Sequence, residues 1–466
     1  MDPQVTRIGT TAATLLAATT MATGCATLRG ASGQPWPFAG VATERFAAPG
    51  GYDQAEAVQF VEFCVELDSQ DDRESHPGEI RYKAQVDTAE WKLVYDSRSA
   101  VDRDYFEYKR RPRAPSGTDV ADDDLGRWAK LYDEIDRTAA SRKIPLRQEG
   151  DVARNAVLNG FGPWQNAWLL YEGVGRNSGR HAIAIRGTVF AAEPSAIEDA
   201  IFQPVLGREF LSRKVSYSQN GAAQLHGGFA HAVFTLLLDR RYGVLEILKE
   251  HQVAPESMLY VVGHSQGAAM ATIVHAFFVN AMSAAEAGPE DPLGLRGSRY
   301  RLKSYAFAQP KPGNYAFAAE FAGYTQRPDN ALVVNNHIDP VPKVPMTLES
   351  TADLDTDFHG HLLVARIVHS LGWPGKMLRS VVSGIADWFT RKSAEGYGNF
   401  YHWDAIKPLH EVASGASWDF VPAGRVIFVY GSAQDAPKDD TFYQHHSTTY
   451  RDLIRAQLGP LASNRQ

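Results

Sequence analysis

The chain of 466 residues contains only two cysteines, Cys25 and Cys64. So small a number excludes a disulfide-rich scaffold. Neither cysteine belongs to the Cys-x-x-Cys pattern that is typical of zinc sites and thiol redox centres. The sequence therefore gives no indication of chemistry based on metal–thiolate bonds.

An excess of positive charge is also missing. The 47 lysines and arginines are outnumbered by 54 aspartates and glutamates, which gives a formal net charge of −7. Electrostatics thus offers no reason to expect a nucleic acid partner. We also expect no membrane-spanning stretch after the N-terminal segment, because no later run looks long and apolar enough.

The first 24 residues are typical of an export signal. Arg7 is their only basic residue, and an uncharged segment rich in Ala, Thr and Leu follows at 8–21. Ala22-Thr23-Gly24-Cys25 then resembles the lipobox of bacterial lipoproteins. That resemblance implies that Cys25 carries acyl chains and that the protein is anchored to the membrane, facing the periplasm or the exterior of the cell envelope. The segment 25–50 is rich in Gly, Ala and Pro, which predicts a tether. The alternatives are an ordinary cleaved signal or a disordered N-terminus. Without lipidation, Cys25 and Cys64 could pair in an oxidising compartment.

Residues 51–466 are predicted to form a single α/β domain. Apolar strands at 182–185, 258–262, 302–307, 331–335 and 425–430 alternate with helical segments, which predicts a mostly parallel sheet with helices on both faces. Surface insertions are expected at about 96–125 and 350–398. An apolar helical stripe at 378–389 could be a lid, a membrane-facing helix or an ordinary packed insertion. The role of residues 51–150 stays open.

Residues 261–269 hold the most informative stretch of the chain. The run 258–262 predicts a buried strand, the pattern Gly263-His264-Ser265-Gln266-Gly267 follows, and a helical run continues from Ala268. Strand, Gly-x-Ser-x-Gly and helix together predict a nucleophile elbow, in which a sharp turn exposes the Ser265 hydroxyl above the sheet. Glycine is needed on either side because strand and helix approach closely there.

A serine nucleophile needs a histidine base and a carboxylate to orient that base. In α/β-hydrolases the chain order is Ser, Asp, His. Asp339 fits because it ends an apolar run and begins a proline-rich loop, whereas Asp329 and Asp353 are weaker candidates. After the run 425–430, two adjacent histidines stand in the right place. We favour His445, with His446 as the alternative.

Five segments in the same order resemble the class 3 lipases, a fungal-lipase-like branch of the α/β-hydrolases. They are Arg186-Gly187-Thr188, His226-Gly227-Gly228-Phe229, the elbow at 263–267, Phe307-Ala308-Gln309-Pro310-Lys311-Pro312-Gly313-Asn314, and Asp339-Pro340-Val341-Pro342-Lys343. The resemblance implies that Thr188 and the backbone N–H of Gln266 form an oxyanion hole. It also implies a lid at about 190–210.

Together these features predict a serine carboxylester hydrolase that acts on lipid esters through Ser265, Asp339 and His445 (or His446). The resemblance and the expected anchor point to a glyceride or a phospholipid as substrate and to a membrane surface as partner. Such a mechanism needs no metal and no organic cofactor. Two alternatives remain: a hydrolase scaffold that serves only as a surface binding protein, and a phospholipase used as an antibacterial effector.

Overall fold

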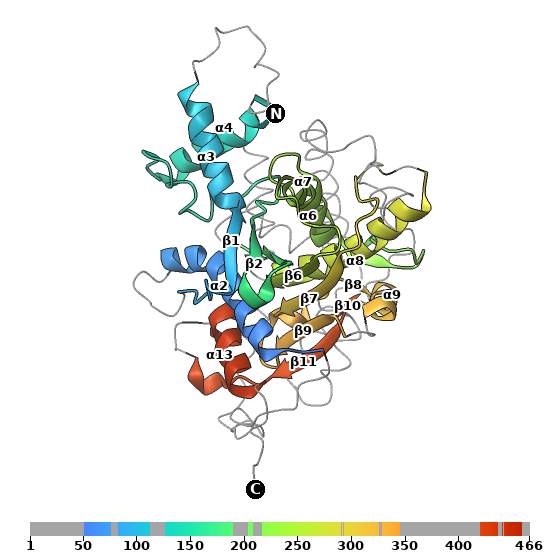
Figure 1. Ribbon diagram of the computed structural model, residues 1–466. Helices are drawn as coiled ribbons and strands as arrows, with labels where there is room; N and C mark the ends of the chain where they lie inside the picture. Colours follow the sequence, from blue (N-terminus) through green and yellow to red (C-terminus); the bar gives the residue numbers. More distant parts are fainter. Residues whose placement is uncertain are drawn as a thin grey trace, which may run out of the picture.

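The computed structural model describes residues 51–75, 83–111, 126–189, 204–207, 217–289, 291, 293–325, 329–344, 420–436, 440 and 442–458. At its centre lies a seven-stranded sheet with the order β1-β2-β3-β6-β7-β9-β11 (Figure 1). The strands are β1 (Trp91–Asp96), β2 (Trp168–Gly173), β3 (Arg180–Ile185), β6 (Met258–His264), β7 (Arg301–Phe307), β9 (Ala331–Asn336) and β11 (Arg425–Val429). The pairs β1–β2 and β2–β3 are antiparallel, and the four pairs from β3 to β11 are parallel. This confirms the mostly parallel sheet predicted from the sequence.

Both faces of the sheet are buried, and alternate residues of a strand contribute to different cores. In β3, Ile183 and Ile185 join one apolar cluster, whereas Ala182 and Ala184 join the other. The first cluster includes residues of α6 (Gly227–Leu238) and α8 (Gln266–Ala287), and the second includes α2 (Gln54–Ser75) and α13 (Ser447–Gln457). Successive side chains of a strand point to opposite faces, so a strand covered on both sides must be apolar at nearly every position.

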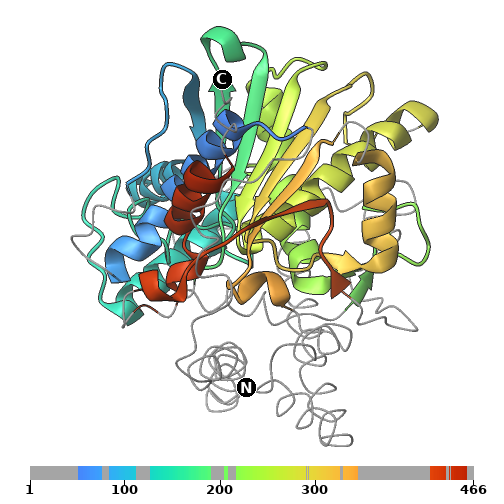
Figure 2. The ribbon, with the colours of Figure 1, turned by 90° about the horizontal axis from the view of Figure 1, so that it is seen from below.

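Helix α2 belongs to the main fold, although it lies at the N-terminal end of the described chain. It packs against α13, near the other end, and against β6. Figures 1 and 2 show α2 in blue beside α13 in red. Phe60, Phe63 and Cys64 of α2 are fully buried in the second core. The first part of the region whose role stayed open therefore covers one face of the sheet.

Smaller elements complete the described chain. A second sheet has the order β10-β8-β5-β4, with β4 (Pro204–Leu206), β5 (Gln224–His226), β8 (Gly313–Asn314) and β10 (Phe420–Val421). The remaining helices used below are α3 (Ser97–Arg110), α4 (Ala129–Arg142), α9 (Tyr315–Thr325) and the short turn η8 (Tyr443–His445).

Part of the expected surface insertion at 96–125 is ordered helix. It begins with α3, whose Val101 and Tyr105 lie in the first core. Residues 112–125, the expected signal and tether at 1–50, and the expected insertion at 350–398 lie outside the described residues.

Helix α8 corrects one expectation from the sequence. With 22 residues it is long and apolar enough to cross a membrane by length and composition alone, so the expectation that no such stretch follows the N-terminus is wrong. In the structure 78% of its apolar window is buried inside the molecule, where the helix packs on β6 and β7. Burial on the sheet accounts for its composition.

Candidate active site

Ser265 stands at the junction of β6 and α8, as the predicted elbow requires. Its backbone has φ 57° and ψ −131°, a region that a non-glycine residue adopts only when its surroundings force it. The surrounding contacts are a hydrogen bond of 3.0 Å from its N–H to the Phe307 carbonyl and one of 2.9 Å from the Ala268 N–H to its own carbonyl. The strained turn is thus held on both sides by main-chain hydrogen bonds.

The two glycines of the pattern are required by close backbone contacts. A Cβ on Gly263 would stand 2.1 Å from the Gly267 carbonyl oxygen, and a Cβ on Gly267 would stand 2.3 Å from the Ile185 carbonyl oxygen. Both distances are far below a normal van der Waals contact. Strand β6, helix α8 and the end of β3 can therefore meet only where side chains are absent.

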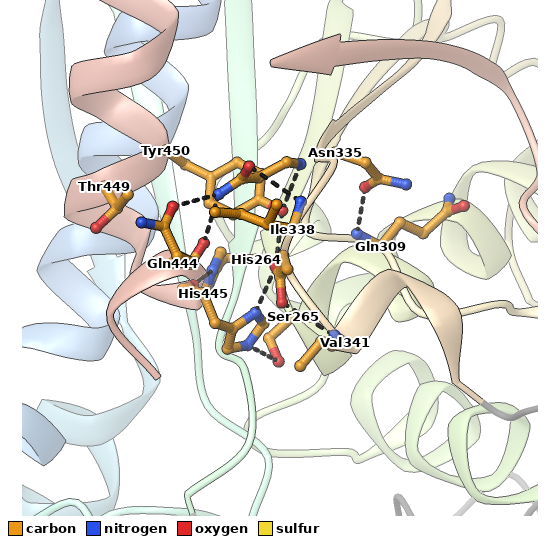
Figure 3. Close-up of polar contacts among 12 residues, drawn as sticks. His264, Ser265, Gln309, Asn335, Ile338, Val341, Gln444, His445, Thr449 and Tyr450 are labelled. Carbon is orange, nitrogen blue, oxygen red and sulfur yellow. Dashed lines mark hydrogen bonds and ion pairs between the residues drawn. The ribbon is translucent and has the colours of Figure 1, made fainter. Parts of the chain in front are cut away.

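Three side chains meet in a continuous chain of hydrogen bonds. His445 Nε2 lies 2.8 Å from Ser265 Oγ (Figure 3). His445 Nδ1 lies 2.8 Å from Asp339 Oδ2. Because a carboxylate only accepts, Nδ1 carries the ring proton and Nε2 offers its lone pair to the serine hydroxyl. The structure thus brings together the three residues that the sequence analysis favoured, each on a separate segment that follows a strand of the sheet.

Asp339 is fully buried, and its carboxylate has further donors. The Val341 N–H donates to Oδ1 at 2.9 Å, and the Tyr450 hydroxyl donates to Oδ2 at 2.7 Å. Hydrogen bonds to the charged form offset the cost of burying a carboxylate. Burial raises the pKa of Tyr450 well above its ordinary value, and the neighbouring Asp339 adds to the rise. The hydroxyl therefore keeps its proton and acts as a permanent donor.

The alternative histidine, His446, contacts a different residue. His446 Nε2 lies 3.1 Å from both carboxylate oxygens of Asp440, whereas the Ser265 hydroxyl contacts His445. The weaker acid candidate Asp329 forms an ion pair of 2.5 Å with Arg425. Asp353 lies outside the described residues.

The two expected oxyanion donors belong to segments that adjoin the serine. Gly187 lies close to Ser265, because a Cβ added to it would stand 3.2 Å from the Ser265 Cβ. Thr188 is the next residue in the chain and is half-buried. Gln266 directly follows Ser265 and is the first residue of α8, so its backbone N–H lies at the positive end of the helix dipole. The expected lid at 190–210 is described only at 204–207, as β4.

The comparisons with known proteins agree with this geometry. Residues 182–349 match the family described as lipase (class 3). Over these residues the chain is similar to the class 3 lipases. The matched segment includes Thr188, Ser265 and Asp339 but ends before His445, so the family match carries no information on the histidine. The fold is that of an α/β-hydrolase.

Solved lipase structures resemble the chain at low sequence identity. A fungal lipase–inhibitor complex shares 23% identity, covers 40% of this chain and 57% of its own, and has a TM-score of 0.27. The triacylglyceride lipase of Rhizomucor miehei shares 19%, covers 45% and 69%, and has a TM-score of 0.26. The M37 lipase shares 15%, covers 77% and 93%, and has a TM-score of 0.36. The chain thus spans little more than half of the first of these lipases, and no curated protein matches it.

Sequence reasoning missed the residues that hold the loop of His445. Asn336 donates from Nδ2 to the Gln444 carbonyl at 3.0 Å and accepts at Oδ1 from the Gly431 N–H at 3.0 Å. Its own N–H donates to the Tyr450 hydroxyl at 2.8 Å. Asn336 ends β9, three residues before Asp339, so the same strand positions both the acid and the loop of His445.

A metal centre is not indicated in the ranges that the structure describes. No group of three or more His, Cys, Asp or Glu side chains is arranged there to hold an ion. Cys64 is a free, buried thiol on α2, and burial raises its pKa well above the ordinary value, with a further rise from Asp68. Cys25 lies outside the described residues.

Proposed function

We propose that the protein is a serine carboxylester hydrolase that acts on lipid esters. The observation that carries the proposal is the pair of 2.8 Å contacts that join Ser265, His445 and Asp339, at a serine held in a strained turn. The family assignment supports the same reaction class. A structural hydrogen-bond network would not need a buried carboxylate, a histidine of fixed tautomer and a strained serine in one line.

In the proposed reaction, Ser265 Oγ attacks the ester carbonyl while His445 Nε2 takes the hydroxyl proton. Asp339 stays ionised and stabilises the resulting imidazolium. The negative oxygen of the tetrahedral intermediate is stabilised by Thr188 and the Gln266 N–H. His445 then donates its proton to the departing alcohol, which leaves an ester between the acyl group and Ser265. A water molecule, deprotonated by the same histidine, cleaves this ester and restores the serine.

The substrate that we propose is a glyceride or a phospholipid. The support is the family assignment and the lipobox-like segment, which would hold the enzyme at a membrane surface. We propose that acyl chains on Cys25 provide this anchor in the cell envelope. Its test is Cys25→Ser, which is expected to move the protein from the membrane fraction to the supernatant. Persistent membrane attachment would place the anchor elsewhere in the chain.

The decisive experiment uses the purified full chain with short-chain p-nitrophenyl esters and a fluorophosphonate probe. We expect turnover and covalent labelling, and Ser265→Ala is expected to abolish labelling and lower kcat by about 10³-fold or more. Ser304→Ala is a matched control, because the Ser304 hydroxyl also contacts a histidine, His275, at 2.9 Å but lies outside the site. A wild-type chain that turns over no ester would favour the binding-protein alternative. A panel of triglyceride and phosphatidylcholine then separates the two substrate classes.

A further inference from the structure

His264, the residue before the nucleophile, lies between the N-terminal helix and the loop of the catalytic histidine. Its Nε2 lies 2.7 Å from the main-chain carbonyl oxygen of His445, and its Nδ1 lies 3.0 Å from Asp68 Oδ2 on α2. The His264 ring is buried, and its centroid is 4.7 Å from that of the His445 ring (Figure 3). One imidazole therefore joins α2 to the backbone of the catalytic loop.

The chemistry of its two partners fixes the protonation of His264. A carbonyl oxygen can only accept a hydrogen bond, so Nε2 must carry a proton. An ionised carboxylate also only accepts, so Nδ1 must carry one as well. Both hydrogen bonds form together only when His264 is an imidazolium.

The surroundings of His264 favour that positive charge. Burial by itself lowers the pKa of the ring, but the charge of Asp68 and its hydrogen bond, then the charge of Asp339 and the carbonyl of His445, outweigh burial and raise the pKa above 6.5. The catalytic His445 ring is a titratable neighbour, with its centroid 4.7 Å from that of His264. Two weakly acidic groups also lie nearby: Cys64 on α2, whose pKa the charge of Asp68 raises, and Tyr450 on α13, whose ring centroid lies 5.8 Å from that of His264. Burial raises the pKa of both, so they stay neutral and the two carboxylates determine the local field.

We propose that Asp68 and His264 form a charged positioning pair, which fixes the main chain of His445 so that its ring stays in line with Ser265. The inference rests on the proposed function. His445 is then held at two points: Asp339 orients the ring, and His264 anchors the backbone that carries it. Small displacements of a base relative to its nucleophile cost large factors in rate. Helix α2 thereby becomes part of the catalytic apparatus as well as of the core.

The Asp68–His264 pair is also expected to make kcat depend on pH. A neutral His264 keeps one N–H, so it must lose either the bond to Asp68 or the bond to the His445 carbonyl. Because the pKa of His264 is raised, the wild-type pair is complete at low pH and is lost as the pH rises through that value. Asp68→Asn removes the largest cause that raises the pKa, so the loss is expected at lower pH.

The test compares Asp68→Asn and Asp68→Glu with Glu66→Gln. Glu66 is a matched control on the same helix, because its carboxylate lies 3.7 Å from Arg98 and belongs to another ion pair. We expect Asp68→Asn to lower kcat for a p-nitrophenyl ester by about 10-fold at mildly alkaline pH, with KM little changed. The alkaline limb of its kcat profile should move to lower pH. Asp68→Glu should recover part of the rate, and Glu66→Gln should behave as the wild type.

Histidine-selective ¹⁵N NMR measures the protonation of the His264 ring. A pair with only a structural role would not make this protonation depend on Asp68. The ring of His264, assigned by its loss in His264→Gln, should titrate at higher pH in the wild type than in Asp68→Asn. Equal titration midpoints would overturn the charged pair whether or not the chain is active. An active wild type with an unchanged kcat profile in Asp68→Asn would overturn the positioning role, whereas an inactive wild type would reject the proposed function instead.

Discussion

The Tyr450 hydroxyl donates a hydrogen bond of 2.7 Å to Asp339 Oδ2, the same carboxylate oxygen that accepts from His445 Nδ1. Two donors on one oxygen restrict the rotation of the Asp339 carboxylate. The same hydroxyl accepts from the Asn336 N–H at 2.8 Å. Tyr450 therefore ties the first turns of α13 to the end of β9 at the position of the acid.

Removing this hydroxyl is expected to weaken both catalysis and stability. Tyr450→Phe takes one donor from a buried carboxylate and leaves the Asn336 N–H without its acceptor. We expect kcat to fall about 10-fold and the free energy of unfolding to fall by about 1–3 kcal/mol. Ester kinetics and denaturant titration measure the two effects separately. A kcat equal to that of the wild type would show that Asp339 is held well enough by the Val341 N–H and His445 alone.

The two adjacent histidines should differ sharply on substitution. His445→Ala removes the base and is expected to lower kcat by about 10³-fold or more, as for other members of such a unit. His446→Ala removes a contact with Asp440 and should change kcat by less than about 10-fold. The comparison needs only purified variants and one chromogenic ester. The reverse order of effects would contradict the geometry of the site.

Much of this site could be predicted from the sequence, because local chemistry determines it. The turn at Ser265 needs glycines on both sides, and strand and helix patterns flank it, so the pattern and its context identify the nucleophile together. Asp339 followed from its place after a strand.

The sequence could not decide between His445 and His446 as clearly as it identified Ser265 and Asp339. Adjacent residues point in different directions, and only the turn η8 and the start of α13 show which ring faces Ser265. The contact between Asp68 and His264 joins residues far apart in the chain, and no local pattern encodes it. Helix α3, within the expected insertion at 96–125, was not predicted because its charged composition hides the apolar residues that it buries.

Thr188 offers a test of the oxyanion hole. If its hydroxyl donates to the developing negative charge, Thr188→Val is expected to lower kcat by about 10²–10³-fold, whereas Thr188→Ser, which keeps the hydroxyl, should retain most of the rate. KM should change little in either variant, because the interaction forms mainly in the transition state. Equal rates in both variants would show that backbone N–H groups suffice.

The elbow glycines should be intolerant of even one methyl group. Gly263→Ala would force a Cβ to within 2.1 Å of the Gly267 carbonyl oxygen, and the backbone must move to relieve it. We expect a loss of about 3 kcal/mol or more in the free energy of unfolding, together with loss of fluorophosphonate labelling. Gly323→Ala is the matched control. Gly323 lies in α9 with no atom within 4 Å of an added Cβ, so it should be neutral or stabilising by about 0.5–1 kcal/mol.

Acid is expected to destabilise the protein through a buried neutral histidine. Burial lowers the pKa of His275 from 6.5 to about 3. Its Nδ1 contacts Ser304 Oγ at 2.9 Å, and its Nε2 is buried without a hydrogen-bond partner among the described residues. Between these two pKa values the unfolded chain binds a proton that the folded chain does not. The contribution of His275 to stability is therefore complete above pH 6.5 and is lost as the pH falls towards 3.

At pH 5 this linkage should cost about 2 kcal/mol relative to neutral pH, since a tenfold change in a protonation equilibrium corresponds to about 1.4 kcal/mol. Denaturant midpoints at pH 7.5 and pH 5 measure it, and His275→Asn, which keeps a polar group near Ser304 without titrating, is the comparison. The variant is expected to be less stable than the wild type at pH 7.5 but to lose about 2 kcal/mol less on acidification. His231, whose pKa burial also lowers to about 3, keeps its share of the acid sensitivity in both proteins. Equal losses in the two chains would mean that His275 is already charged, or exposed, in the folded state.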